Sequence, residues 1–200
     1  MAGQALPSAA HPPRKPRADA TRNHERLLET AKTVFAEKGP AASLDEIAKA
    51  AGVGIGTLYR HFPTRDALVE QVYRHEATQL AEAAERLCAS HPPVEALRQW
   101  LFLFVEYFTT KQIMAQALSA TAGGTATLYA ISSVLLNNAV STLAEQAVAR
   151  GEIRLTLEPM DLLRAIAGVG NVSPGRDWEE RAKRLVDILI AGLRVPQAGR

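Results

Sequence analysis

The chain has 200 residues, of which 47% are apolar, and it carries 23 Lys and Arg residues against 21 Asp and Glu. This composition is typical of a soluble globular protein. There is no apolar run of membrane-spanning length, because Glu106 interrupts the densest stretch, residues 100–108. The N-terminus lacks the apolar segment of a secretory signal, and the single cysteine, Cys88, cannot form a disulfide within the chain. We therefore expect a cytoplasmic protein with no membrane contact.

Basic residues are concentrated near the N-terminus, although the net charge of the whole chain is only +2. Residues 1–66 hold 10 Lys and Arg against 7 Asp and Glu, whereas residues 67–200 hold 13 against 14. Residues 1–20 include four prolines and few large apolar side chains, which predicts a disordered basic arm. Such an arm is either a solvated tail or a segment that lies along DNA phosphates or enters a minor groove.

Residues 21–66 are predicted to form three helices and the start of a fourth. Apolar residues at helical spacing indicate a first helix, which Gly39 ends as a C-terminal cap. Ser43 and Glu46 match a capping box, in which each side chain bonds a backbone N–H of the first turn of the next helix. Thr64 is a favoured N-cap for the fourth helix.

The segment 43–62 has the pattern of a helix-turn-helix. The residues expected on the buried side of its first helix are Ile47, Ala48 and Ala51. Gly52 supplies a turn residue with unrestricted φ, and Leu58 and Phe62, spaced i, i+4, anchor the second helix from behind. The exposed face of that helix can then enter the major groove of DNA. The same spacing would also suit a helical hairpin inside an ordinary bundle, with its aromatic residues in the core.

The exposed face of this second helix offers few polar groups. Thr57 can contact a thymine methyl or a base edge, Arg60 can reach guanine or phosphate, and Tyr59 can donate to a phosphate. Lys49 and Arg65 flank the helix and are placed for phosphates. The candidate DNA-contacting residues by this geometry are Lys49, Ile55, Gly56, Thr57, Tyr59, Arg60, His61 and Arg65.

Three stretches within residues 22–70 resemble the DNA-binding domain of the tetracycline-repressor (TetR) family. They are AKTVFAEKG at 31–39, SLDEIAKAAGVGIGTLYRHF at 43–62 and TRDAL at 64–68. The resemblance implies three DNA-reading helices followed by a larger helical domain that binds a ligand and dimerises. It also adds Ser43 or Leu44, at the start of the second helix, to the expected DNA contacts.

A further group of helices is expected after the break at residues 90–93, Ser-His-Pro-Pro. The expected helices span about 94–110, 112–120, 125–149, 159–169 and 177–193. The predicted fold class is therefore all-α, with about nine helices. The expected parts are a disordered basic arm at 1–20, a helix-turn-helix DNA-binding domain at 21–66 and a ligand-binding and dimerisation domain at 67–195.

Aromatic residues gather in the second half of the chain, where several lie near one face of a helix. This pattern suits either a packed core or an apolar pocket in which a few polar groups orient a small molecule. The candidate ligand-binding residues are Trp100, Phe104, Tyr107, Phe108, Met114, Leu118, Tyr129, Ser133 and Asn137.

The last two predicted helices each carry an apolar stripe. Two such helices from each of two subunits would form a four-helix bundle, although the stripes could instead pack only within the chain. A homodimer would pair two reading helices on a palindromic operator and so multiply their specificity. The candidate dimer residues are Leu162, Ile166, Leu185, Ile188 and Leu189.

No catalytic constellation is apparent in the sequence. The five histidines form no metal-binding pattern with neighbouring Cys, Asp or Glu, and the glycines at 52–56 lack the preceding strand of a phosphate-binding loop. We expect neither an enzyme nor a cofactor. The expected function is a sequence-specific regulator that binds double-stranded DNA, a repressor that a small apolar ligand releases from its operator. A regulator without a ligand, an activator and a helical module that binds no DNA are the alternatives.

Overall fold

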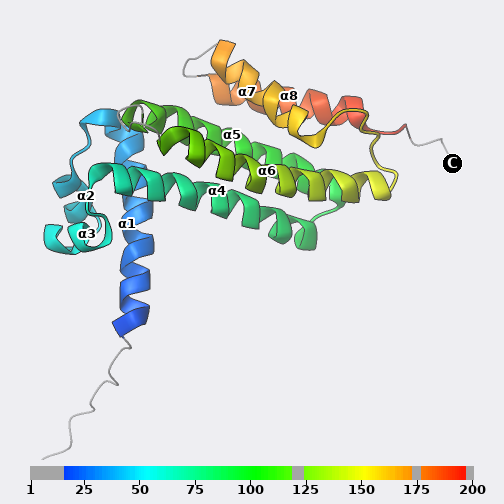
Figure 1. Cartoon of the computed structure of the whole chain (residues 1–200). Coiled ribbons are helices and arrows are strands. Elements are labelled where there is room, and N and C mark those ends of the chain that lie inside the picture. The colour runs from blue at the N-terminus through cyan, green and yellow to red at the C-terminus, as the bar shows by residue number, and fades with distance from the viewer. Residues whose placement is uncertain (1–15, 119–123, 173–176, 197–200) are drawn as a thin grey trace, which may run out of the picture.

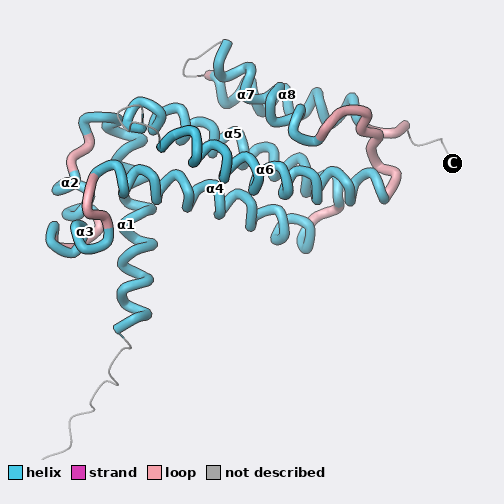
Figure 2. The backbone as a smooth tube through the Cα atoms, viewed as in Figure 1, coloured by secondary structure: helices cyan, strands magenta, loops and turns pink. Residues whose placement is uncertain are grey.

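The computed structural model describes residues 16–118, 124–172 and 177–196, and within them the chain is helical, as the sequence predicts (Figure 1). The elements are α1 (Pro16–Lys38), a single 3₁₀ turn (Gly39–Ala41), α2 (Leu44–Ala50), α3 (Ile55–His61), α4 (Arg65–Ser90), α5 (Pro93–Leu118), α6 (Gly124–Ala149), α7 (Pro159–Val172) and α8 (Trp178–Leu193). Within the described residues, Figure 2 shows the loops that join α1 to α5 in turn and the loop that joins α6 to α7. The described part of the chain therefore has eight α-helices, where the sequence suggested about nine.

The difference in number arises at α5, where the sequence suggested two helices and the structure has one. Separate helices were expected at 94–110 and 112–120, but the structure has one helix that runs without a break from Pro93 to Leu118. The residues at the expected boundary, 109–112, include neither glycine nor proline. Nothing there interrupts the backbone hydrogen bonds, so the helix continues.

The start of α1 also differs from the expectation. A disordered arm was expected through residue 20, but α1 begins at Pro16. Proline is favoured in the first turn of a helix, where its missing N–H has no helical partner to lose. The rest of the expected arm, residues 1–15, lies outside the described residues.

The predicted caps and the predicted turn glycines are confirmed. The Glu46 backbone N–H donates to Ser43 Oγ at 3.1 Å, and the Ser43 N–H donates to Glu46 Oε2 at 3.0 Å. Thr64 Oγ1 accepts the N–H of Ala67 at 3.0 Å and starts α4. Gly39 and Gly52 have φ of 55° and 66°. These local features end α1, begin and end α2, and begin α4.

The long helices α4, α5 and α6 lie side by side, and α7 and α8 cover one side of this layer (Figure 1). At one end, α1 crosses α4, and α2 and α3 pack beside it. Trp100 is fully buried between α5 and α4, and its Nε1 donates to the Leu80 carbonyl at 2.7 Å. Because α4 spans both groups of helices, the expected division at residues 66–67 falls inside a continuous helix.

The loop between α6 and α7 is held to the end of α8. The Arg154 N–H donates to the Leu193 carbonyl at 2.8 Å, and the Val195 N–H donates to the Glu152 carbonyl at 3.1 Å. The pairing stops at one bridge, between Ile153 and Arg194, and builds no sheet in the described residues. Within the same residues, no helix combines the length and apolar character needed to cross a membrane.

Candidate nucleic-acid interface and ligand pocket

The unit formed by α2 and α3 is built on a small apolar interior. The residues predicted for its buried side are 0–4% exposed, and they are Ile47, Ala48, Ala51, Leu58 and Phe62. The small alanines of α2 let α3 approach closely. The positive φ of Gly52 turns the chain, and the Val53 N–H donates to the Ala48 carbonyl at 3.0 Å. The helix-turn-helix geometry expected from the spacing is therefore present.

The opposite face of α3 is open to solvent. Tyr59 is 49% exposed and Ile55 is 37% exposed. Gly56 and Arg60 are also exposed, whereas Thr57 is half-buried. The exposure predicted for this face is confirmed, except that Thr57 and His61 are partly covered. Contact between these residues and DNA stays a prediction.

The C-terminal end of α3 packs against α1 through a histidine pair that the sequence did not indicate. The His24 ring lies 5.5 Å from the His61 ring and stacks on Phe62 at 5.0 Å, measured between ring centroids. Burial lowers the pKa of His24, and the nearby His61 and His75 lower it further. His61 is thus half-buried at the edge of the face, and no spacing along the chain could have shown that His24 is its neighbour.

The predicted DNA-contacting residues outside α3 differ in their exposure and in the partners that they contact. Lys49 and Ser43 are exposed, but the Ser43 hydroxyl is already used in the cap of α2, and Leu44 is partly buried against the core. Arg65 points inward: its guanidinium donates to the Ala42 carbonyl and lies 5.1 Å from the centroid of the Phe35 ring. Arg65 therefore holds the helices of this unit together, in contrast to the phosphate contact expected from its position.

A separate cavity of about 170 Å³ lies between α4, α5, α6 and α7. Four of the predicted ligand-binding residues line it, namely Phe104, Tyr107, Phe108 and Ser133. The other lining residues are Tyr73, Lys111, Ser132, Leu136, Met160, Leu163, Arg164 and Ala167. Successive aromatic rings of α5 lie about 6.2 Å apart and continue to Trp178 of α8, so one wall of the cavity is aromatic.

Two family models match the chain and cover both groups of helices. Residues 27–72 match the model for bacterial regulatory proteins of the tetR family. Residues 92–195, just over half of the chain, match the C-terminal domain of SbtR-like transcriptional regulators. The chain belongs to the TetR family. Its members are transcriptional regulators that bind DNA through the helix-turn-helix.

Solved structures of TetR proteins share the fold over most of the chain. The TetR transcriptional regulator SCO0520 from Streptomyces coelicolor is 41% identical, with a TM-score of 0.78, over 86% of this chain and 99% of that protein. The TetR transcription regulatory protein from Mycobacterium vanbaalenii is 30% identical, with a TM-score of 0.75, over 90% of this chain and 99% of that protein.

Curated TetR-type relatives match shorter stretches. The transcriptional repressor Rv3405c from Mycobacterium tuberculosis is 40% identical over 76 residues, which is 38% of this chain and of that protein. The regulator AcrR from Shigella flexneri is 30% identical over 102 residues, which is 50% of this chain and 47% of AcrR. The matched stretches thus span about half or less of these relatives, so their whole activities do not transfer to this TetR protein.

Not every predicted pocket residue of this TetR protein lines the cavity. Trp100 is 0% exposed and Met114 is 2% exposed, and both belong to the core, which was the alternative left open for the aromatic stripe. Asn137 is exposed on α6 and does not line the cavity, because α6 turns this residue outward. The side chains of Leu118 and Tyr129 lie outside the described residues.

The predicted dimer residues also divide into two groups. Leu162 and Ile166 are 2% and 0% exposed, so they pack inside the chain's own core. Leu185 and Leu189 are partly buried, and Ile188 is 67% exposed. The stripe on α7 was assigned to the wrong face, because helical periodicity shows which residues share a face but not what that face meets. The apolar residues of α7 outside the core are Ala165 and Val172, which are exposed, and Gly168 and Val169, which are half-buried.

Proposed function

We propose that this TetR-family protein is a cytoplasmic repressor that binds a palindromic operator as a homodimer. A small, mostly apolar molecule in the cavity between α4 and α7 releases it from DNA. The observation that carries the proposal is the course of α4: it begins against the helix-turn-helix and, two turns later, contributes Tyr73 to the wall of the cavity. The proposal requires no catalytic step, metal or cofactor.

The exposed face of α3 supplies the DNA contacts in this proposal. Tyr59 and Arg60 reach phosphates or a guanine edge, and Lys49 adds a phosphate contact at the end of α2. Ile55 meets a thymine methyl, and Gly56 lets the backbone approach the bases closely. Basic residues near the start of α1, such as the exposed Arg22, extend the positive surface.

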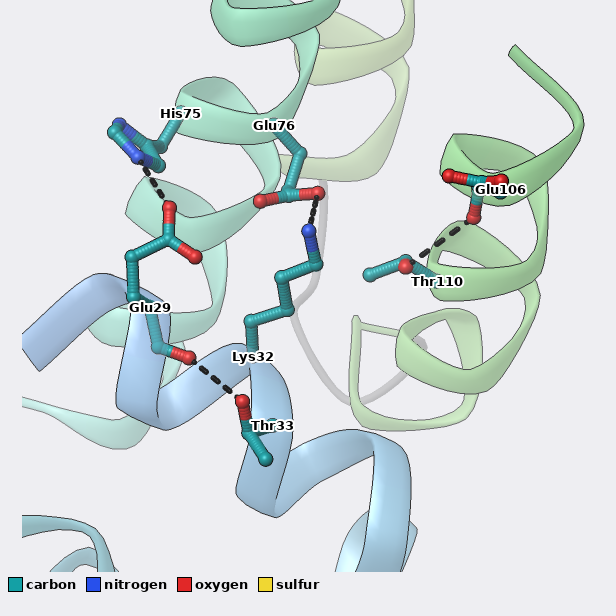
Figure 3. Close-up of polar contacts among 7 residues, drawn as sticks. All are labelled: Glu29, Lys32, Thr33, His75, Glu76, Glu106 and Thr110. Carbon is teal, nitrogen blue, oxygen red and sulfur yellow. Dashed lines mark hydrogen bonds and ion pairs between the residues drawn. The ribbon is translucent and has the colours of Figure 1, made fainter. Parts of the chain in front are cut away.

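Side-chain contacts between α1 and α4 link this reading unit to the cavity. Figure 3 shows that Lys32 of α1 meets Glu76 of α4, with Nζ and Oε2 at 2.5 Å. One residue earlier on α4, His75 Nε2 lies 3.0 Å from Glu29 Oε1. Glu76 is one turn from Tyr73, so a ligand that shifts this part of α4 also shifts its contacts with α1. Such a ligand binds the shifted state more tightly and thereby lowers DNA affinity.

The apolar face shared by α7 and α8 suits the homodimer. Ile188 and Val172 are 67% and 86% exposed, which is costly for apolar side chains in a free chain. Gly168 on α7 and Gly192 on α8 have no atom near the position of a Cβ, so a partner helix could lie close to the backbone. Ile188→Glu is expected to produce monomers in analytical ultracentrifugation. Val148→Glu, at a position near the end of α6 that is 44% exposed, is the matched control.

The test of the proposed reading face is operator binding by variants of α3. Arg60→Ala is expected to weaken binding to DNA from the region upstream of the protein's own gene by about 1–3 kcal/mol. Tyr59→Phe should weaken it less, because it removes one phosphate hydrogen bond. Arg150→Ala, in the turn directly after α6, makes the same charge change and should leave binding unaltered, because this end of α6 lies away from α3 (Figure 1).

Binding is measured by titration at several salt concentrations, with each variant's melting temperature as a check on folding. A contact between Arg60 and phosphate also predicts a shallower dependence of affinity on salt in Arg60→Ala. Unchanged operator affinity in both α3 variants would show that the assigned face is not the one that reads DNA.

A further inference from the structure

His24 places a ring that can be charged at one end of the apolar stripe of α1. Three later residues at helical spacing from it are 0–3% exposed, and they are Leu28, Ala31 and Phe35. His24 itself is half-buried, one turn before the first of them. An aliphatic or aromatic residue would complete this stripe, so the histidine introduces a titratable group into an otherwise apolar contact.

The contact that His24 makes is with the C-terminal end of α3. Its ring stacks on Phe62 at 5.0 Å, and the His61 ring lies 5.5 Å from it, measured between ring centroids. Phe62 is the C-cap of α3, where its backbone N–H donates to the Leu58 carbonyl at 2.8 Å, and its side chain is 1% exposed. The imidazole ring of α1 therefore packs directly on the residue that anchors this end of α3.

The surroundings of His24 disfavour a positive charge on its ring. The titratable groups that act on it are His61 of α3, His75 of α4 and the neighbouring Glu25 of α1. Burial lowers the pKa of His24 most, His61 and then His75 lower it further, and the opposing effect of Glu25 is the smallest of these causes. Glu29 Oε1 lies 3.0 Å from His75 Nε2 and offsets part of the charge of that ring (Figure 3). The packing of α3 on α1 thus favours a neutral His24.

We propose that His24 is a positioning residue for operator binding: its neutral ring holds the C-terminal end of α3 in place, and a charge on the ring weakens this packing. A charged His24 loses solvation in this contact and repels a charged His61, and movement of α3 away from α1 relieves both effects. Base reading requires α3 to be held in one orientation, so weaker packing lowers operator affinity.

The direction of the pH effect follows from the lowered pKa of His24. The packed arrangement is fully favoured above the ordinary histidine value of 6.5 and loses stability as the pH falls from 6.5 through the lowered pKa. Added positive charge by itself has the opposite effect, because it strengthens binding to DNA phosphates. This inference rests on the proposed function in that α3 reads the operator, and it adds a residue outside the reading face on which that reading depends.

The first experiment measures the packing of α3 in the full chain without DNA. Amide hydrogen exchange, corrected for the intrinsic effect of pH, reports the protection of the α3 amides. Between about pH 7.5 and about pH 5.5, protection in the unaltered chain is expected to fall about threefold to tenfold relative to His24→Phe, the size of one weakened aromatic contact. His24→Phe keeps a ring on Phe62 that cannot be charged. His91→Phe, at the opposite end of α4 from α3, is the matched control and should follow the unaltered chain (Figure 1).

The second experiment measures DNA binding over the same pH range. The probes are DNA from the region upstream of the protein's own gene and an unrelated duplex of equal length. The affinity of the unaltered chain for the upstream DNA, relative to that of His24→Phe, is expected to fall about threefold to tenfold in acid. The same ratio for the unrelated duplex should stay constant, because phosphate contacts carry no sequence information. His24→Ala, which removes the ring, should bind the upstream DNA weakly already at neutral pH, and His24→Phe should recover most of this loss.

The outcomes separate the inference from the proposed function. Equal pH dependence of α3 protection in the unaltered chain and in His24→Phe would overturn the inference, because a merely structural ring gives no difference. Tighter operator binding by the unaltered chain than by His24→Phe in acid would also overturn it, since the charged ring would then contact a phosphate. Weaker protection of α3 without a loss of operator affinity would support the positioning role and count against α3 as the reading helix, which Arg60→Ala tests independently. If the upstream DNA is not bound at any pH, the proposed operator is wrong and the exchange experiment decides the inference.

Discussion

We call the helices α1 to α3 the reading unit and the helices α4 to α8 the body. The contacts that stabilise these two parts differ in how far apart the contacting residues lie in the sequence. In the reading unit, the capping pair Ser43 and Glu46 is three residues apart, and Gly52 alone turns the chain between α2 and α3. In the body, Arg98 meets Asp187 at 2.6 Å across 89 residues, and Thr109 Oγ1 donates to Glu179 at 2.7 Å across 70 residues. The first kind of contact is visible as a sequence pattern, and the second is not.

The two candidate sites differ in the same way. The DNA-reading face belongs to one short helix, and its residues are exposed as soon as that helix is anchored. The cavity is formed by four helices and exists only when they have packed. A substitution in the reading unit should therefore act locally, whereas one in the body should act on the cavity from a distance.

The largest effect is expected from the body residue Trp100, which is fully buried and donates to the Leu80 carbonyl. Trp100→Ala should lower the free energy of unfolding by about 3–5 kcal/mol, because it leaves a void under the aromatic wall. Trp100→Phe, which keeps a ring near Phe104, should cost less. Urea denaturation followed by circular dichroism measures both. A loss from Trp100→Ala no larger than that from Trp100→Phe would contradict the assumed tight packing of the body.

Substitution of the turn glycine, Gly52, is expected to have the next largest effect on the free energy of unfolding. It tests whether the reading unit depends on local backbone conformation. Gly52 has φ +66° and Gly54 has φ −69°, and neither has an atom within 4 Å of an added Cβ. Gly52→Ala should therefore destabilise the protein by about 1–2 kcal/mol through backbone strain alone. Gly54→Ala is the matched control, with little change in the free energy of unfolding. Equal effects of the two alanines in thermal denaturation would exclude backbone strain as the reason for Gly52.

Removal of the α2 cap should have a somewhat smaller effect. Ser43→Ala removes the acceptor of the Glu46 N–H and is expected to lower the free energy of unfolding by about 1 kcal/mol. Ser43→Asp restores an N-cap acceptor and should recover most of this loss. The measurement is thermal unfolding without DNA, so that a DNA contact of Ser43 has no influence. Failure of the aspartate to restore stability would show that the hydroxyl acts through something other than the cap.

The smallest effect is the pH dependence contributed by Glu46. A hydrogen bond from Lys38 at 2.6 Å, and then those from Ser43, lower the pKa of Glu46 from 4.5 to about 2. Because the folded-state pKa is depressed, the stabilisation is fully present above pH 4.5 and is lost as the pH falls from 4.5 through about 2. Glu46→Gln should remove this dependence, so its melting temperature should approach that of the unaltered protein as the pH falls. A constant difference between the two across that range would contradict the assigned cause.

Most of the reading unit could be predicted from the sequence, and the exceptions have a common cause. The caps at Ser43 and Thr64, the turn at Gly52 and the exposure of Tyr59 depend on interactions within a few residues. The inward turn of Arg65 was missed, because the Ala42 carbonyl and the Phe35 ring reach it only after α1 and α4 have packed.

In the body, the sequence by itself determined that the chain is helical and that α5 is rich in aromatic residues, because periodicity and composition are local properties. Tertiary structure decided that Trp100 belongs to the core while Phe104 lines a cavity, and that Ile166 faces inward while Ile188 faces solvent. It also decided that Lys111 of α5 and Arg164 of α7, which are 53 residues apart in the sequence, line the same cavity. The physical reason is that a helical stripe specifies which residues share a face, whereas the neighbouring helices specify what that face touches.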